Sequence, residues 1–251
     1  MSPRFAYALF MLLALIVFVQ VRRCMPKPAG FAALPWHHQL AIAMAAFVGG
    51  VFGAKLPFAL ASNESWLTQA AWLADGKTII TGLAGGYLAV EVTKWFLGIR
   101  IKTGDTFALP LAVALAVGRW GCFFNGCCHG VPTALPWAID FGDGVPRHPT
   151  QIYESLFHAA MACVLLYLML RHWLPTHRLQ LYLIAYCLYR FGTEFIRPEP
   201  AWWLGMTFYQ WSALGLAGAL AGQWVFESNR SRSSNPANLS LDMASAGSGS
   251  V

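Results

Sequence analysis

Charged residues are scarce in this sequence, and acidic residues are the scarcest of them. Asp, Glu, Lys and Arg make up 11% of the 251 residues, and only 11 residues are acidic. Apolar residues reach 57%, whereas soluble domains hold about 45–50% apolar and about 25% charged residues. A soluble core cannot bury that excess of apolar side chains. The composition therefore excludes an ordinary soluble domain and favours a protein whose solvent is lipid.

Three further patterns are missing. No C-x-x-C occurs, and the spacing of cysteines and histidines matches no standard zinc pattern, so we predict neither a metal nor a cofactor. No internal repeat is visible, which disfavours a transporter built from inverted repeats. No A-x-A motif follows the first apolar run, which ends in Arg22 and Arg23, so we expect this segment to be retained and not cleaved as a signal peptide.

Long apolar runs, by contrast, recur along the chain. A helix that crosses the hydrocarbon layer needs about 20 mostly apolar residues. Such runs are found at Phe5–Val21, Leu40–Leu60, Ile79–Leu97, Thr106–Phe124, Gln151–Leu170, Leu179–Phe195 and Met206–Phe226. We therefore predict an all-α integral membrane protein of about seven transmembrane helices, forming one polytopic domain over residues 1–226.

Positive charge near the ends of the runs predicts their orientation, because Lys and Arg are retained in the cytoplasm. The side of the first connection carries Arg22, Arg23, Lys27, Arg100, Lys102, Arg171, Arg178, Arg230 and Arg232. The other side carries Arg4, Lys77, Arg147 and Arg197. We predict an N-terminus outside the membrane and a cytoplasmic C-terminus. The net charge of +6 is then a topology signal that attracts anionic lipid, and no nucleic acid partner is expected.

The end of the chain has a different composition from about Glu227 onward. Residues 227–251 are rich in Ser, Asn, Ala and Gly. Such a segment cannot bury enough apolar surface to fold alone. We predict a disordered cytoplasmic tail here.

Glycines spaced four apart occur on three of the runs. They are Gly49 and Gly53, Gly82 and Gly86, and Gly218 and Gly222. Because small residues let helix backbones approach closely in lipid, we interpret all three pairs as packing sites.

Charges within the runs point to function, because one at the membrane centre costs about 2.5–3.5 kcal/mol on insertion scales. They are Lys55, Glu91, Lys94, Arg119, Glu154, Arg190 and Glu194. Glu91 and Lys94 are spaced for self-pairing on one helix, as are Arg190 and Glu194. Arg119 has no acid nearby in sequence, so only tertiary pairing or a bound anion can satisfy it.

Arg119 and Arg190 lie near the outer ends of the fourth and sixth runs. Arginine presents planar, bidentate donors that match phosphate oxygens. The two side chains therefore predict a site for a phospholipid headgroup, with the lipid tails along the helices.

The stretch from Gly118 to Gly130 holds half of the six cysteines, namely Cys122, Cys127 and Cys128. A metal site is disfavoured by the spacing. A disulfide from Cys122 to Cys127 or Cys128 is plausible on an oxidising outer face, and buried inert thiols are the other alternative. Downstream, His148 lies in an outer loop and is suited to proton transfer near neutral pH.

The sequence resembles the prolipoprotein diacylglyceryl transferase family over about Gln39–Phe226. The resemblance is carried by Gly118-Arg119-Trp120-Gly121 with Asn125, Gly126 and Gly130, by the segment from His148 to Glu154 that includes Tyr153, and by the segment from Arg190 to Pro198. It implies transfer of diacylglycerol from phosphatidylglycerol to the lipobox cysteine thiol of lipoprotein precursors. It also implies that Arg119 and Arg190 bind phospholipid and take part in catalysis, with Glu194 orienting Arg190.

Three departures from the family pattern bear on the site. The usual His-Gly-Gly of the third span is absent, and no histidine occurs between His38 and His129. Cys122 stands where the family commonly has Asn, and Cys127 where it has Glu.

The resemblance implies substrate contacts at Asn125, Gly121, Gly130 and Tyr153, and at Cys122, Cys127 and Cys128.

Two classes of function follow. In the first, the protein is a transferase, and Glu91, His148 or His129 replaces the missing histidine as the base that removes the proton from the acceptor thiol. In the second, the protein keeps the fold but binds lipid headgroups or performs thiol redox chemistry with its cysteine group.

Overall fold

The computed structural model describes residues 2–26, 29–61 and 78–233. Within these ranges the long helices are α1 (Pro3–Cys24), α3 (Trp36–Ala61), α5 (Ile79–Phe96), α6 (Asp105–Phe124), α7 (Thr150–Leu170), α8 (Arg178–Thr193) and α9 (Phe208–Ser233). A short helix, α2 (Ala29–Ala32), and a 3-10 turn, η1 (Glu194–Ile196), complete the helical elements. Each of the seven predicted apolar runs thus coincides with a helix.

Four of these helices have the length and hydropathy to cross a membrane. They are α1, α3 over Trp36–Pro57, α6 and α7. The structure is helical apart from two small hairpins, and its four candidate spans are consistent with the membrane class predicted from composition. Among the described residues, α5, α8 and α9 do not meet this criterion.

The predicted tail begins within a helix. Residues 227–233 continue α9. The helix therefore extends beyond Phe226, where the apolar composition ends. Residues 234–251 of the predicted tail lie outside the described residues.

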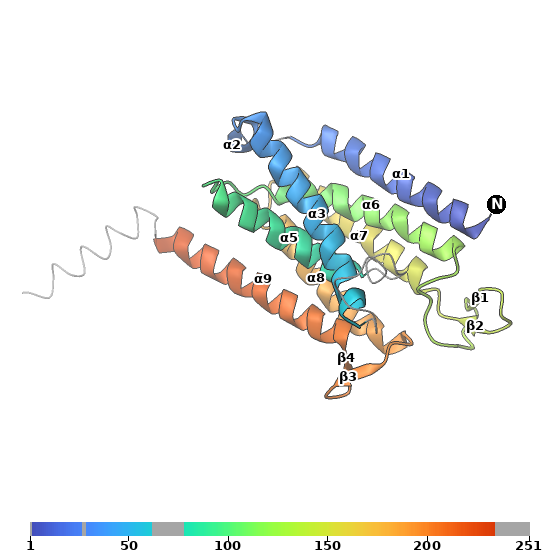
Figure 1. Cartoon of the computed structure of the whole chain (residues 1–251). Helices are drawn as coiled ribbons and strands as arrows, with labels where there is room; N and C mark the ends of the chain where they lie inside the picture. The colour runs from blue at the N-terminus through green and yellow to red at the C-terminus, as the bar shows by residue number, and fades with distance from the viewer. Residues whose placement is uncertain (1, 27–28, 62–77, 234–251) are drawn as a thin grey trace, which may run out of the picture.

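The helices lie side by side with alternating direction (Figure 1), so that α1 packs along α6, α3 along α5, α6 along α7 and α8 along α9. The N-terminus of α1 lies at the same end of the bundle as two small hairpins, and the end of α9 lies at the opposite end. The hairpins are β1 (Ile139–Asp140) with β2 (Pro146–Arg147), and β3 (Ala201–Trp203) with β4 (Met206–Thr207), both antiparallel.

The first hairpin is closed by Asp140. Its carboxylate accepts backbone N–H bonds from Gly142, Asp143 and Gly144 at 2.8–3.1 Å. Gly142 and Gly144 have φ of 109° and 77°, which glycine adopts without steric cost. This turn fixes the tip of the hairpin between α6 and α7.

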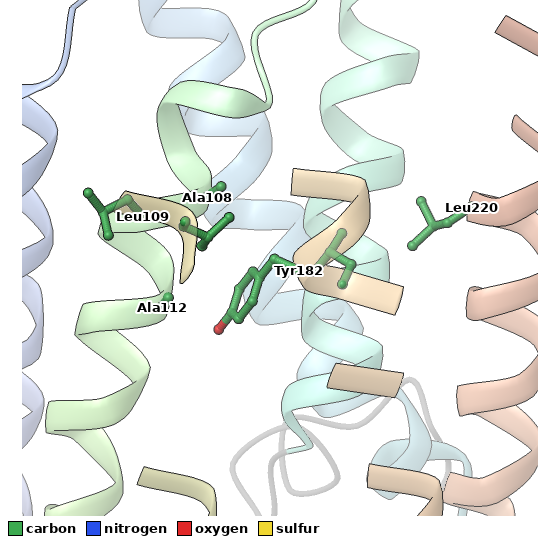
Figure 2. Close-up of a cluster of buried hydrophobic side chains, with 7 residues drawn as sticks. Ala108, Leu109, Ala112, Tyr182 and Leu220 are labelled. Carbon is green, nitrogen blue, oxygen red and sulfur yellow. The ribbon is translucent and has the colours of Figure 1, made fainter. Parts of the chain in front are cut away.

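The largest apolar cluster lies between α6, α7, α8 and α9 (Figure 2). It contains Ala108, Leu109 and Ala112 of α6, Leu165 of α7, Tyr182 and Leu183 of α8, and Leu220 of α9. Alanines on α6 let the neighbouring helices approach, and the larger side chains fill the space between them. The cluster fixes how α6, α7 and α8 lie relative to each other.

The glycine interpretation is correct for two pairs. A Cβ atom on Gly49 would lie 2.3 Å from Ala89 Cβ, and one on Gly53 would lie 2.4 Å from the carbonyl oxygen of Thr81. The pair Gly82 and Gly86 faces α3 in the same way. The interpretation is wrong for Gly218 and Gly222, because nothing lies within 4 Å of a Cβ added at either position.

We expect Gly85→Ala to destabilise the protein, since an added Cβ would lie 2.4 Å from the carbonyl oxygen of Gly49 and 2.9 Å from Gly53 Cα. Overpacking of this kind costs about 1–3 kcal/mol. The matched control is Gly222→Ala, which enters open space and should be neutral or stabilising by up to about 1 kcal/mol. Thermal unfolding in detergent micelles measures both, and equal effects of the two variants would contradict close packing of α3 on α5.

Candidate functional site

Arg119 lies near the end of α6 and is buried, with 7% of its surface exposed. Its Nη2 atom forms an ion pair with Oε2 of Glu154, in the first turns of α7. Tertiary pairing, one of the two possibilities for Arg119, is therefore present. The partner is 35 residues away in sequence and meets Arg119 because α6 packs along α7.

Glu154 is the centre of a wider polar network. Its Oε2 also accepts from Arg197 Nη2 at 3.1 Å, and its Oε1 accepts from Tyr186 Oη at 2.7 Å. His158 lies one turn further along α7, with Nε2 3.8 Å from Oε1. All of these side chains except Tyr186 carry or can carry charge, and each is shielded from solvent.

Helical spacing explains how two helices supply this network. Glu154 and His158 are four apart on α7, and Tyr182 and Tyr186 are four apart on α8, so each pair shares a helix face. Tyr182 Oη lies 2.8 Å from His158 Nδ1. The two faces meet in a ladder of polar contacts within an otherwise apolar bundle.

Arg190 forms a second buried pair. Its Nη1 lies 2.6 Å from Glu194 Oε2, as the spacing of four predicted. Glu194 Oε1 accepts from Thr207 Oγ1 at 2.9 Å, and the Arg190 guanidinium lies 5.3 Å from the centre of the Tyr209 ring. The charge of Arg190 also acts on Glu154, so both predicted arginines belong to one electrostatic site.

Several polar atoms of the site have no hydrogen-bond partner among the described residues. They include Nε of Arg119, Nε of Arg197 and Oε1 of Gln151, all buried. Buried donors without a partner are costly. Two arginines that converge on one carboxylate, each with a spare donor, form an arrangement that can hold an anionic ligand.

Gly130 brings the three motif segments together. A Cβ there would lie 2.6 Å from the carbonyl oxygen of Ile196, 2.8 Å from His148 Cβ and 3.0 Å from Thr150 Cγ2. The backbone N–H of Gly130 donates to the carbonyl of His148 at 2.8 Å. Gly130 therefore acts by close packing, and only a residue without a side chain fits.

The three cysteines lie next to this network. The Sγ atoms of Cys122, Cys127 and Cys128 lie within 4.8 Å of one another. Arg119 Nη1 is 3.8 Å from Cys122 Sγ. All six cysteines of the chain are free thiols, so the structure does not contain the disulfide that was one alternative.

The end of α6 explains why these thiols meet. The N–H of Gly126 donates to the carbonyl of Phe123, and the N–H of Cys127 donates to that of Cys122, both at 3.1 Å. With Gly126 at φ 69°, this is a Schellman motif, which brings the residue after the glycine onto the last turn of the helix. Cys127 is thereby placed against Cys122.

Cys128 is held by the same loop. Its φ of 65° is in the left-handed region, and its carbonyl accepts from Thr150 Oγ1 at 2.6 Å. The carbonyl of Cys127 accepts from Gln151 Nε2, also at 2.6 Å. Hydrogen bonds with the neighbouring Cys122 and Cys127 thiols lower the pKa of Cys128, and the charges of Arg119 and Arg197 lower it further.

His148 and Tyr153 lie at the entrance to α7. His148 Nδ1 is 3.4 Å from Tyr153 Oη, which also accepts from Trp137 Nε1 at 2.6 Å. His148 is only partly buried, and its backbone pairs with Gly130 and Val131. The structure thus brings His148 next to the motif segments that carry the arginines.

Two predicted binding residues have structural contacts of their own. A Cβ on Gly121 would lie 3.1 Å from Phe10 Cβ and 3.3 Å from the carbonyl oxygen of Tyr7, so Gly121 packs against α1. Asn125 caps α6, and its N–H donates to the carbonyl of Gly121 at 3.0 Å. Its side chain also hydrogen-bonds to Cys127.

Glu91 is not brought to the site. It pairs with Lys94 at 2.8 Å, and both line a small cleft with Lys102 and Gly104, at the end of the bundle where α6 begins. Arg119 is 14 positions further along α6 than Asp105 (119 − 105 = 14), about 21 Å at 1.5 Å per residue. The self-pairing alternative for Glu91 is therefore confirmed.

Three residues of the site were not predicted from the sequence, namely Glu154, Arg197 and Tyr186. Glu154 was recognised as a charge within a predicted span, and Arg197 was assigned to an outer loop. A usable signal was present, because Glu154 closes the motif that begins at His148 and no Lys or Arg lies within a turn of it.

Comparison with known proteins identifies the family to which the chain is similar. The family model described as Prolipoprotein diacylglyceryl transferase matches residues 5–226. A protein of Cupriavidus pinatubonensis named phosphatidylglycerol--prolipoprotein diacylglyceryl transferase is 33% identical over 233 residues, which cover 87% of this chain and 80% of the relative. Proteins with the same name from Cupriavidus necator and Clostridium tetani are each 31% identical, over 88% and 65% of this chain and 88% and 70% of their own lengths.

No solved structure matches the chain. The family model covers the α1–α9 bundle, including every residue of the buried network around Glu154. The chain belongs to the prolipoprotein diacylglyceryl transferase family.

Proposed function

We propose that the protein transfers the diacylglyceryl group of phosphatidylglycerol to the lipobox cysteine thiol of a prolipoprotein, with Arg119 and Arg197 holding the phosphate. The observation that carries this assignment is the convergence of two buried guanidinium groups on the single carboxylate of Glu154. Family membership supplies the reaction class, and the buried network supplies the phosphate site.

The charge balance of the network favours one bound anion. Arg119 and Arg197 contribute two positive charges and Glu154 one negative charge, which leaves +1, while Arg190 and Glu194 cancel each other. A buried net charge is costly unless it is paired. The phosphodiester of phosphatidylglycerol carries one negative charge, and the spare Nε donors of Arg119 and Arg197 suit its oxygens.

An apolar groove beside the network suits the acyl chains. It runs between α6 and α7 and is lined by Val113, Ala116, Val117, Trp120, Ser155, Ala159 and Ala162. Trp120 follows Arg119 directly, and Ser155 follows Glu154 directly. A lipid with its phosphate at the arginines therefore finds an apolar path for its tails along the same two helices.

The transfer makes one bond and breaks one. The thiolate sulfur of the acceptor attacks the glyceryl carbon that carries the phosphate ester, the carbon–oxygen bond breaks, and glycerol phosphate leaves with the electron pair. The arginines stabilise the charge that develops on the leaving oxygen. The thiol proton must go to a base, since the thiolate is the nucleophile.

We assign that base to His148. The family histidine of the third span is absent, and Glu91 is remote and paired with Lys94. His148 is partly accessible and lies beside Gly130, where the three motif segments meet. Tyr153 orients the ring through its contact with Nδ1. His129 is the second candidate, with its ring stacked on Phe141.

We propose that all seven long helices cross the inner membrane of a bacterium, with the N-terminus outside and the C-terminus cytoplasmic. Alternating packing of α5, α8 and α9 with the four candidate spans supports this topology. The end that carries Lys102, Arg178 and Arg230 is then cytoplasmic. Phosphatidylglycerol, a lipobox peptide and the bilayer are the partners, at the outer face, and residues 234–251 are a cytoplasmic tail.

The alternative is a non-transferase that binds headgroups or uses Cys122, Cys127 and Cys128 in redox chemistry. The proximity of the three thiols favours it. The two functions are separated by supplying phosphatidylglycerol and a lipobox peptide to the purified protein. A transferase releases glycerol phosphate, and a folded protein that releases none would contradict the proposed reaction.

We expect Arg119→Lys to lower the rate of glycerol phosphate release roughly 100-fold or more, because a lysine cannot donate as a planar fork and a lost oxyanion donor costs about that much. Arg178→Lys is the matched control, since Arg178 pairs with Asp105 at the far end of α6. Near-normal activity of Arg119→Lys alongside the control would refute the phosphate site.

Glu154→Gln should destabilise the protein by about 3–5 kcal/mol, the cost of removing one partner of a buried ion pair. The control, Glu91→Gln, breaks an ion pair whose carboxylate side chain is 42% exposed, and less than about 1 kcal/mol is expected. Unfolding midpoints in micelles compare the two. A small loss in Glu154→Gln would show that the arginines do not depend on this carboxylate.

For the base, His148→Ala should reduce kcat roughly 100-fold or more, the usual contribution of a positioned general base, while leaving the unfolding midpoint unchanged. His172→Ala, an exposed histidine after α7, serves as the control. If His148→Ala keeps full activity, the base is elsewhere, and His129→Ala becomes the next variant to measure.

A further inference from the structure

The group of Cys122, Cys127 and Cys128 has no role in the proposed transfer reaction. Spacing alone predicted no metal at these positions. The structure changes that expectation, because the Schellman turn at Gly126 and the left-handed conformation of Cys128 direct three thiols toward one point.

The geometry of the thiols fits a single metal ion. Sulfur atoms bound to one ion at about 2.3 Å each lie about 4 Å apart, and the three Sγ atoms already lie within 4.8 Å of one another. Their backbone is fixed from two sides. Thr150 and Gln151 hold the carbonyls of Cys128 and Cys127 at 2.6 Å, so little rearrangement is needed to close the ligand set.

The donor set selects the kind of metal. All three ligands are soft sulfurs, which select copper(I), zinc or iron–sulfur clusters. Structural zinc takes four protein ligands, and within the described residues no fourth His, Cys, Asp or Glu joins this group. The neighbouring His129 directs Nδ1 toward the carbonyl oxygen of Gly130 and stacks on Phe141. Copper(I) is satisfied by three sulfurs.

Charge also favours thiolate ligation. Three thiols that bind one copper(I) ion release three protons to solvent, and the complex carries two negative charges. Arg119 Nη1 lies 3.8 Å from Cys122 Sγ. A guanidinium group next to the sulfurs offsets the negative charge that such a complex gathers.

We propose that Cys122, Cys127 and Cys128 form a three-thiolate site for copper(I) at the outer end of α6. No change in oxidation state is involved, since copper enters and stays as copper(I). The site adjoins the proposed phosphate site at Arg119, but it does not require that the proposed function hold.

The test is a titration of the full-length protein, purified anaerobically in detergent, with copper(I) against a chromogenic copper(I) chelator. We expect one ion per chain and an X-ray absorption spectrum with sulfur as the only near neighbour. Cys122→Ser, Cys127→Ser and Cys128→Ser should each weaken binding by more than the roughly 10–100-fold that loss of an outer-shell partner costs.

Cys163→Ser is the matched control, because Cys163 is an exposed free thiol on α7 outside the group, and its copper affinity should equal that of the parent protein. Unfolding midpoints confirm that the serine variants are folded. Binding that survives in the triple serine variant overturns the proposal, as does a Cys122–Cys127 disulfide in protein isolated without oxidant. Zinc(II) that binds these cysteines more tightly than copper(I) also overturns it.

Glycerol phosphate release, measured on the same preparations before copper(I) is added, keeps the two proposals distinguishable. A protein that binds copper(I) but transfers no lipid supports the metal site and contradicts the transferase. A protein that transfers lipid but binds no copper(I) supports the transferase and contradicts the metal site.

Discussion

The rest of the site depends on the need to neutralise Arg119 within an apolar bundle. A charge at membrane depth must have a partner, and Glu154 is the partner that the packing of α6 on α7 provides. Once Glu154 is fixed, Arg197 and Tyr186 bind to the same carboxylate. The ion pair thereby draws the segment after α8 back onto α7, and three distant motifs become one site around Gly130.

The sequence was sufficient to predict the helices and one buried pair. Apolar runs of about 20 residues fold as helices in lipid because only then are the backbone groups satisfied within the segment. Arg190 and Glu194 could be paired because a spacing of four is a local property of a helix. The pairing of Arg119 with Glu154 could not be predicted, because it depends on the register between two helices, and no local pattern encodes that register.

The cysteine group could be predicted from the sequence only in part. The contact between Cys122 and Cys127 is local, and a glycine just after an apolar helix is a recognised signal for the Schellman turn that produces it. The standard spacings of metal-binding motifs did not predict this cysteine group, because those spacings describe ligands on a short turn or on a regular helix. The approach of Cys128 was beyond local reasoning, since it requires the first turn of α7 to hold the loop through Thr150 and Gln151.

Exchange of a carboxylate for a thiol at position 127 has a direct electrostatic consequence. The resemblance to the family implies Glu at this position, and the chain has Cys127 there. The thiol lies beside Cys122, which contacts Arg119, and it brings no carboxylate charge there, so Glu154 is left to balance both Arg119 and Arg197. A site with two guanidinium groups and one carboxylate attracts an anion more strongly than a balanced one. The phosphodiester proposed for this end of the bundle is such an anion.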